Sequence, residues 1–187
     1  MTPLPDVPRI VTDRLLLRGF EQRDVEPYTV MMSEPDVTRF LSTGAPLSPI
    51  EAWRQLAMLA GHWMLRGFGI WAVEERSTGQ LIGRVGCFEP AGWPGFEIGY
   101  VLAKPAWGKG YALEAARASL DYARNVLDRD DILSVIRPDN AGSIRVATKL
   151  GAIRAETVDF FGAPADLYRY PKLKTQTASL TPTQVSV

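Results

Sequence analysis

A glycine-rich turn between an apolar strand and a long helix is the feature that most restricts how this chain can fold. The turn occupies residues 106–112 and reads AWGKGYA. Residues 96–102, which precede it, have the length and the aromatic and β-branched content of a buried strand. Apolar residues after the turn recur at helical spacing and predict an amphipathic helix over about 110–126. The sequence therefore predicts a strand, a turn and a helix in direct succession.

This turn has the chemistry of a phosphate-binding site. The first amides of a helix have no partners within it, and they carry the positive end of the helix dipole. Gly108 and Gly110 have no β-carbon that would keep a phosphate away from those amides. Charge-assisted hydrogen bonds contribute about 1.5–3 kcal/mol each, so three or four of them can hold a diphosphate. Two glycines one residue apart also occur where a turn only starts a helix, so the spacing leaves both interpretations open.

The composition is that of one ordinary globular domain. Of the 187 residues, 46% are hydrophobic and 22% charged, which fits a single domain at 9–171 between an irregular arm at 1–8 and a loose tail at 172–187. The formal net charge is zero, so we expect no nucleic-acid partner, and an anion must be bound by local donors. The sequence contains neither an apolar run of membrane-spanning length nor a signal-peptide pattern, so we expect no membrane partner.

The single cysteine and the single histidine limit the chemistry further. Cys87 leaves no internal disulfide and fits the reducing cytoplasm, where we expect the protein to be. Its apolar surroundings in the sequence favour packing over a role as a nucleophile. We expect packing for His62 as well, and one histidine with one cysteine argues against a metal site.

The rest of the chain predicts further strands and helices. Strands are expected at 15–17, 70–74, 81–88, 132–136, 153–161 and 167–170, and helices at 24–33, 49–66 and 141–150. Ser48, Pro49 and Glu51 form a capping-box start for the second helix, and Asn140 can cap the last one. With the strand and helix around the turn, these elements add up to an α/β domain with a mixed sheet of six or seven strands and about four helices.

Several motifs of the chain resemble those of the GNAT superfamily of N-acetyltransferases, and in particular its RimJ/RimL-like branch. The turn is similar to the acyl-CoA loop Q/R-x-x-G-x-G/A, which in that branch commonly reads WGKGYA followed by EA, as it does at 107–115. Residues 12–18, TDRLLLR, resemble the opening T-x-R-L-x-L-R, and Asn140 and Ser143 match an N-x-x-S pattern. The resemblance covers roughly residues 9–170. Trp107 stands where the wider superfamily has Gln or Arg, so binding there would depend on main-chain amides.

The resemblance implies a fold and a donor. The sheet would be mixed and mostly antiparallel, and its two central parallel strands, at 96–102 and 132–136, would splay apart to hold acetyl-CoA between them. The residues that would contact this acyl donor are Gly99, Tyr100, Val101, Trp107, Gly108, Lys109, Gly110, Tyr111, Ala112, Asn140 and Ser143. Asn140 can serve as a helix cap and a ligand at the same time.

Glu97 and Ser143 are the candidate catalytic residues. Glu97 alternates with Gly99 on one face of the central strand, where its carboxylate can take a proton from the amine directly or through water. The alternative is a solvent-facing glutamate. By analogy, Ser143 lies near the leaving sulfur. Many superfamily members carry a tyrosine acid where this chain has Ala147, so the thiolate must be protonated by Ser143 or by water.

The acceptor is expected to be a primary amine. An α-amine has a pKa of about 7.7–8.0, whereas that of lysine is about 10.4, so a site without a strong base suits a protein N-terminal α-amine. The resemblance leaves a small-molecule amine as an alternative, and so does a catalytically silent acyl-CoA-binding module. Exposed hairpins of this family often pair, which leaves a homodimer open.

Overall fold

The computed structural model describes residues 7–41 and 44–172, and these form a mixed sheet in the order β1-β2-β3-β4-β5-β6-β8-β7. Neighbouring strands are antiparallel except for β5 and β6, which are parallel. The strands are β1 (Ile10–Val11), β2 (Leu15–Arg18), β3 (Ile70–Glu75), β4 (Gln80–Phe88), β5 (Phe96–Leu102), β6 (Ile132–Ile136), β7 (Ile153–Phe160) and β8 (Ala163–Arg169).

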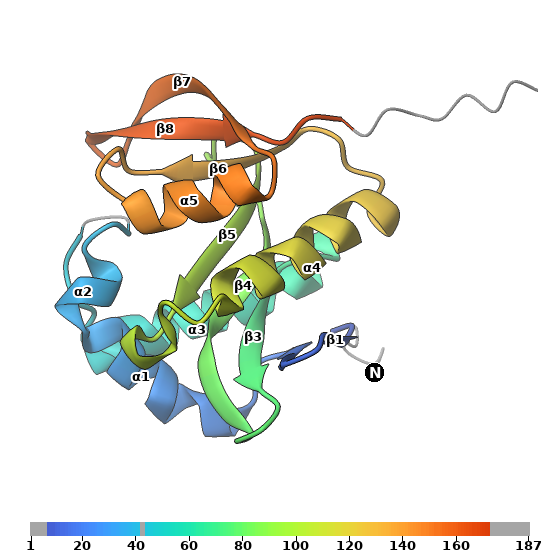
Figure 1. The fold of residues 1–187 in the computed structure, drawn as a ribbon. Coiled ribbons are helices and arrows are strands. Elements are labelled where there is room, and N and C mark those ends of the chain that lie inside the picture. The colour runs from blue at the N-terminus through green and yellow to red at the C-terminus, as the bar shows by residue number, and fades with distance from the viewer. Residues whose placement is uncertain (1–6, 42–43, 173–187) are drawn as a thin grey trace, which may run out of the picture.

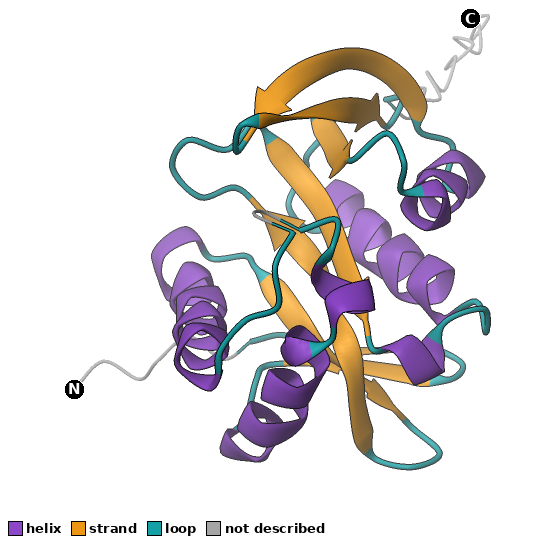
Figure 2. Ribbon diagram, turned by 90° about the vertical axis from the view of Figure 1, so that its left-hand side faces the viewer, coloured by secondary structure: helices purple, strands orange, loops and turns teal. Residues whose placement is uncertain are grey.

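Helices cover both faces of this sheet (Figure 2). They are α1 (Val25–Ser33), α2 (Pro35–Thr38), α3 (Pro49–Arg66), α4 (Tyr111–Asn125) and α5 (Ala141–Lys149), with 3-10 turns at Gln22–Asp24 and Lys104–Ala106. Buried residues of α1 and α3 pack with Phe88 and Val101 of the sheet. Those of α4 and α5 pack with Val85 and Ile98, which point to the opposite face. The sheet is thus buried on two sides, as a three-layer α/β domain requires.

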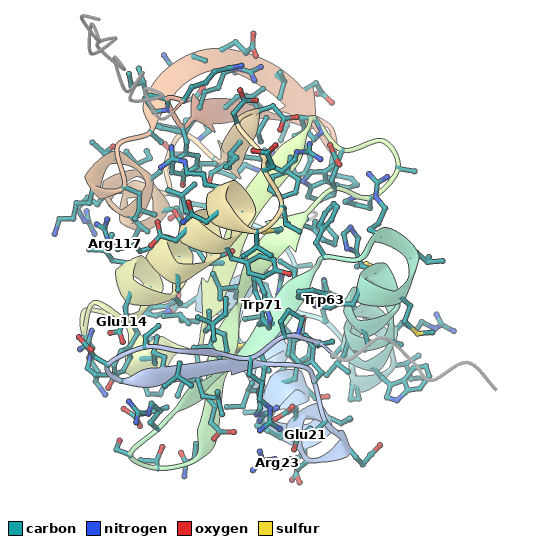
Figure 3. The ribbon with its side chains drawn as sticks, turned by 90° about the vertical axis from the view of Figure 1, so that its right-hand side faces the viewer. Glu21, Arg23, Trp63, Trp71, Glu114 and Arg117 are labelled. Carbon is teal, nitrogen blue, oxygen red and sulfur yellow. The ribbon has the colours of Figure 1, made fainter. Side chains whose placement is uncertain are left out.

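An aromatic contact joins the two helical layers at one end of β3. The ring of Trp71 packs against that of Trp63 in α3 (Figure 3), at a centroid distance of 4.9 Å, and against that of Tyr122 in α4, at 5.1 Å. The Trp71 indole also donates a 2.7 Å hydrogen bond to the carbonyl oxygen of Pro8. The described end of the N-terminal arm is therefore held against the core, while residues 1–6 and the tail from 173 lie outside the described part of the chain.

Local sequence signals account for the best-predicted elements. The Ser48 hydroxyl accepts from the Glu51 amide at the start of α3, the Glu51 carboxylate accepts from the Ser48 amide, and Gly67 ends the helix with φ 74°. The predicted bounds of β5, β6 and α3 all match the structure. The predicted α/β fold with a mostly antiparallel sheet and a central parallel pair is confirmed.

The counts of strands and helices differ from the prediction. The described residues form eight strands rather than six or seven, because the two-residue β1 is too short to show an alternating pattern. The same residues form five α-helices rather than about four, because α2 begins at Pro35, where the sequence suggested only the end of α1. Proline is accepted in the first turn of a helix because its missing amide hydrogen has no partner there.

The two parallel strands separate soon after they meet. Their pairing covers only Phe96 with Ile132 and Glu97 with Leu133. Beyond that point β5 stays paired with β4, and β6 turns away with the β7–β8 hairpin (Figure 1). The gap that opens between the two strands positions the candidate site.

Candidate active site

The turn before α4 presents main-chain amides. Gly110 is the N-cap of α4 and Gly108 lies two residues before it; their φ angles of 82° and 75° are in the region that favours glycine. No side chain of the described residues caps this helix, and the first amide bonded inside it is that of Glu114, to the carbonyl oxygen of Gly110 at 3.1 Å. A β-carbon at Gly108 would meet no atom within 4 Å. The turn is thus open to an anion that approaches these amides.

An ion pair from the other end of the chain holds the turn in place. The Glu114 carboxylate, in the first turn of α4 (Figure 3), accepts hydrogen bonds from the Thr12 hydroxyl at 2.6 Å and from the main chain of Arg14 at 2.9 Å. Nε and Nη2 of Arg14 lie 2.7 and 2.6 Å from the same carboxylate, and its Nη1 donates to the Lys109 carbonyl oxygen at 2.9 Å. Burial opposes the ionisation of Glu114, but these hydrogen bonds outweigh it and lower the Glu114 pKa. We call Thr12, Arg14 and Glu114 the turn clamp.

Two aromatic side chains of the turn are also engaged. The Trp107 indole donates to the carbonyl oxygen of Leu102 at 2.7 Å, which fixes the turn to the end of β5. The Tyr111 hydroxyl donates to Glu75, and the Arg14 guanidinium lies 4.5 Å from the centre of the Tyr111 ring. In the structure both side chains support the turn.

A cavity of about 320 Å³ lies in the gap between β5 and β6. It brings together six of the predicted residues: Glu97, Gly99, Tyr100, Val101, Asn140 and Ser143. The turn at 107–112 is not part of its described lining and lies past the end of β5. The predicted site residues therefore form two groups, one in the gap and one at the start of α4.

Main-chain direction separates the three predicted residues of β5. The Ser134 hydroxyl donates to the Ile98 carbonyl oxygen at 2.7 Å, so the main chain of Ile98 faces β6, and strand alternation turns that of Tyr100 the same way. By the same alternation the N–H and C=O groups of Gly99 and Val101 face β4. Tyr100 is therefore the one of the three whose N–H and C=O face the gap. Its hydroxyl donates to the Ser143 carbonyl oxygen at 2.9 Å.

Glu97 is buried rather than solvent-facing. Its side chain accepts hydrogen bonds from the Trp93 indole at 2.6 Å and from the Val135 amide at 3.3 Å, and the residue is 8% exposed. Burial raises the Glu97 pKa above its usual value, although the two hydrogen bonds favour the ionised form. The solvent-facing alternative is therefore wrong. A carboxyl group with a raised pKa at the wall of a cavity is a candidate for proton transfer.

The start of α5 forms another wall of the cavity. The Asn140 side chain accepts from the Ser143 amide at 3.1 Å, so the predicted helix cap is confirmed, and both residues also line the cavity. Ala147 is fully buried, and no tyrosine can act from its position. The Tyr100 pKa lies well above its ordinary value because of burial, which keeps that phenol protonated at neutral pH.

Cys87 and His62 pack as predicted. Cys87 is fully buried, and burial raises its thiol pKa to about 12. His62 is buried with its Nδ1 2.7 Å from the Phe68 carbonyl oxygen, and burial lowers its pKa. Residues 7–41 and 44–172 contain no cluster of side chains that could hold a metal ion, and within these ranges no helix is long and apolar enough to cross a membrane.

The turn clamp is what sequence reasoning missed. Its residues belong to two of the quoted motifs, and Arg14 and Glu114 are 100 residues apart in the chain. The co-occurrence of both motifs in one chain was the available signal, but a single sequence does not show that they touch.

Known proteins share the sequence and the fold of this chain. Residues 14–153 match the acetyltransferase (GNAT) domain. The chain is 33% identical over 168 residues to an uncharacterised Bacillus subtilis protein, YkkB, covering 86% of this chain and 94% of YkkB. It is also 30% identical over 145 residues to an uncharacterised N-acetyltransferase of Bacillus subtilis, YoaA, covering 77% of this chain and 82% of YoaA.

Solved structures share the fold over most of their length. An acetyltransferase from Agrobacterium tumefaciens superposes with a TM-score of 0.81 at 27% identity, covering 92% of this chain and 99% of that one. RimL, a ribosomal L7/L12 α-N-protein acetyltransferase solved in complex with coenzyme A, superposes with a TM-score of 0.69 at 19% identity, covering 87% and 97%. At that identity the likeness concerns the fold alone. From the domain match and the sequence relatives, the chain belongs to the GNAT family of acetyltransferases.

Proposed function

We propose that this protein transfers the acetyl group of acetyl-CoA to the α-amine of a protein N-terminus. The observation that carries the proposal is the start of α4, where no side chain of the described residues caps the helix and the clamp keeps the glycine turn open. Main-chain amides at Gly108, Gly110 and the first turn of α4 suit a diphosphate, since an anion there meets both hydrogen-bond donors and the positive end of the helix dipole.

The remaining contacts to the donor follow from the gap between the strands. The main chain of Tyr100 faces this gap and can bond an amide-containing chain as an extra ladder partner would. Asn140 and Ser143 border the same cavity from the start of α5. When bound, acetyl-CoA supplies an activated acyl group, and this chain supplies a position for it between two strands that are each fixed on their far side.

Proton transfer is assigned to the side chains of the cavity. Glu97 takes the proton of the amine at its carboxylate, directly or through a water, and its raised pKa brings this group nearer to working pH than an ordinary glutamate. Ser143 or water supplies a proton at the departing sulfur. An α-amine, with a pKa of about 7.7–8.0, has a larger neutral fraction at neutral pH than a lysine side chain, so it depends less on Glu97 for its deprotonation.

The names of two fold neighbours agree with this class of acceptor. RimL acetylates the α-amine of ribosomal protein L7/L12, as its name states, and another fold neighbour, from Vibrio cholerae, is described as a ribosomal-protein-serine acetyltransferase. These similarities support a protein acceptor for the present chain.

The experiment is a screen of amines against acetyl-CoA. Release of free CoA thiol is followed with peptides that carry a free α-amine, with the same peptides blocked at the α-amine but containing lysine, and with small amines. Acetylation at the peptide α-amine, located by mass spectrometry, is the expected result. Turnover of small amines alone would favour a small-molecule enzyme, and binding of acetyl-CoA without any turnover would favour a silent acyl-CoA-binding module.

A further inference from the structure

Arg84 is a charged side chain that lines the cavity together with Glu97. Arg84 of β4 pairs with Val101 of β5, and Phe88 of the same strand pairs with Glu97. Residues two apart on a strand share a face, so Arg84 projects from the same side of the sheet as Glu97. Arg84 and Glu97 both line the cavity. The cavity lining therefore carries one negative side chain, Glu97, and two positive ones, Arg84 and Arg137, of which Arg137 donates to the carbonyl oxygens of Ala163 and Pro164.

The Arg84 guanidinium has unused hydrogen-bonding capacity. Its Nε is the one buried side-chain nitrogen or oxygen, among all the residues that the structure describes, that has no hydrogen-bond partner. By contrast, all three side-chain nitrogens of the buried Arg18, in β2, donate hydrogen bonds, to Asp24, Glu74 and the Gly19 carbonyl oxygen. A buried charged donor without an acceptor is costly, and a ligand that brings an acceptor into the cavity removes that cost.

A second donor stands beside Arg84 on the helical wall. Gln55 of α3 lines the same cavity and accepts, through Oε1, a 2.6 Å hydrogen bond from the buried hydroxyl of Tyr28. Its oxygen is engaged in this way, and its amide nitrogen is left as a donor. Arg84 also acts on Tyr28, through its charge and a side-chain hydrogen bond, and on Glu97 through its charge, and these effects oppose the rise in pKa that burial causes in both groups. Arg84 and Gln55 together offer N–H groups where a planar anion would accept them.

The spacing fits a small zwitterion. The Glu97 carboxyl group leans over Gly99, with Oε1 3.7 Å from the point that a β-carbon of Gly99 would occupy. The pair of Val101 with Arg84 is the next one along this face, roughly 7 Å further on. Strand spacing thus brings the backbone positions of the two side chains within the reach of one small acceptor.

We propose that Arg84 and Gln55 bind a carboxylate of the acceptor, so that the enzyme selects amines whose own carbon skeleton carries a carboxylate a few atoms from the nitrogen. This inference rests on the proposed acetyl transfer and narrows its substrate class. Two sources share this chemistry: the side chain of an aspartate or glutamate at the first position of a protein, and the α-carboxylate of a free amino acid.

The test compares acceptors that differ only in that group. Heptapeptides beginning with Asp or Asn, and with Glu or Gln, are otherwise identical, and free amino acids are compared with their amides. For each pair, kcat/KM is measured with the wild type, with Arg84→Met and with Arg84→Lys. Wild type is expected to favour the acid on the order of 10- to 100-fold, as for a charge-assisted bond. Arg84→Met should bring the ratio close to one, and Arg84→Lys should leave an intermediate preference.

The ratio within one preparation does not depend on the folded fraction, because both acceptors meet the same enzyme. Arg54→Met, an exposed arginine next to Gln55 on α3, serves as the matched control and should keep the wild-type ratio. If Arg84→Met retains the acid preference, or if the wild type shows no such preference, the carboxylate site is overturned. Peptides turned over without acid preference contradict this inference alone. If free amino acids are preferred over their amides and no peptide is turned over, the protein acceptor is contradicted and the carboxylate site at Arg84 is supported. Turnover of no acceptor in the panel, acidic or neutral, overturns both.

Discussion

The turn clamp predicts that cofactor affinity depends on a residue that need not touch the cofactor. Glu114→Gln keeps the shape of the side chain and removes its charge. The one oxygen that remains can still accept from Thr12 and the main chain of Arg14. The new NH2 group is a donor and then faces Nε and Nη2 of Arg14, which in the wild type lie 2.7 and 2.6 Å from the carboxylate. Roughly half of the hydrogen bonds that Glu114 accepts are therefore lost.

The magnitude follows from exposure. A hydrogen bond to a charged group contributes about 1.5–3 kcal/mol, but the Arg14 side chain is 47% exposed and that of Glu114 17% exposed, so water weakens their contact. We expect Glu114→Gln to lower the free energy of unfolding by about 2 kcal/mol. A looser turn must be ordered when acetyl-CoA binds, so the Kd should rise about tenfold, which corresponds to about 1.4 kcal/mol.

The assays are urea denaturation and calorimetric titration with acetyl-CoA, applied to Glu114→Gln, Arg14→Met and the double variant. The two single effects should add to more than the double effect, with a coupling of about 1 kcal/mol. Glu156→Gln, which breaks an exposed ion pair with Arg169 in the β7–β8 hairpin, is the control and should change stability by about 0.5 kcal/mol or less. Additive single effects, or an unchanged Kd in Glu114→Gln, would refute the clamp.

The same pair has a definite pH dependence. The folded-state pKa of Glu114 lies below its ordinary value of 4.5, so the unfolded chain binds its proton at a higher pH than the folded chain does. The stability that the ionised group contributes is therefore present above about pH 4.5 and lost as pH falls through the folded-state pKa. The difference in stability between wild type and Glu114→Gln should shrink below pH 4.5, and a constant difference would contradict this account.

Three further perturbations address the donor site, the base and the fold. Gly110→Glu places a carboxylate at the turn and a side chain where φ is 82°, so acetyl-CoA binding should be lost while strain lowers stability by only about 1–2 kcal/mol; calorimetry that finds an unchanged affinity would remove this turn from the donor site. Glu97→Gln should lower turnover more at neutral pH than at pH 9, because an α-amine with a pKa of about 7.7–8.0 is mostly protonated at neutral pH and needs a base there, whereas at pH 9 it is mostly neutral; an equal loss at both pH values would retire Glu97 as the base. Arg18→Met leaves Asp24 buried without its partner, so the free energy of unfolding should fall by about 3–5 kcal/mol, and a loss below about 1 kcal/mol would show that the pair is not needed.

Local signals made much of the fold predictable. The strand, the glycine turn and the helix at 96–126 follow from periodicity, and α3 follows from its capping box and its terminal Gly67, because each of these patterns acts over a few neighbouring residues. The two-residue β1 carries too few side chains to show a pattern. The splayed strands were inferred from the family resemblance, since no local rule indicates where a ladder between two strands ends.

The site could be predicted as a set of residues but not as an arrangement. Strand alternation placed Glu97 on the same face as Gly99, yet its burial depends on Trp93 from a loop and on the Val135 amide from another strand. The main-chain difference between Tyr100 and its neighbours depends on which strand lies on each side of β5. Arg84 showed nothing unusual in the sequence, because its unpartnered nitrogen becomes visible only when the cavity around it is formed.

The way the gap is built has a consequence for how enzymes of this design diversify. The gap arises where two strands of one continuous sheet part, and β4 and β8 hold those strands in register from outside. Loop exchange at the rim can therefore alter which amine enters while the floor of the gap stays in position. A library that randomises residues 39–41 and 90–92, while leaving Trp93 and the strands β4, β5 and β6 untouched, is accordingly the natural place to look for new acceptors.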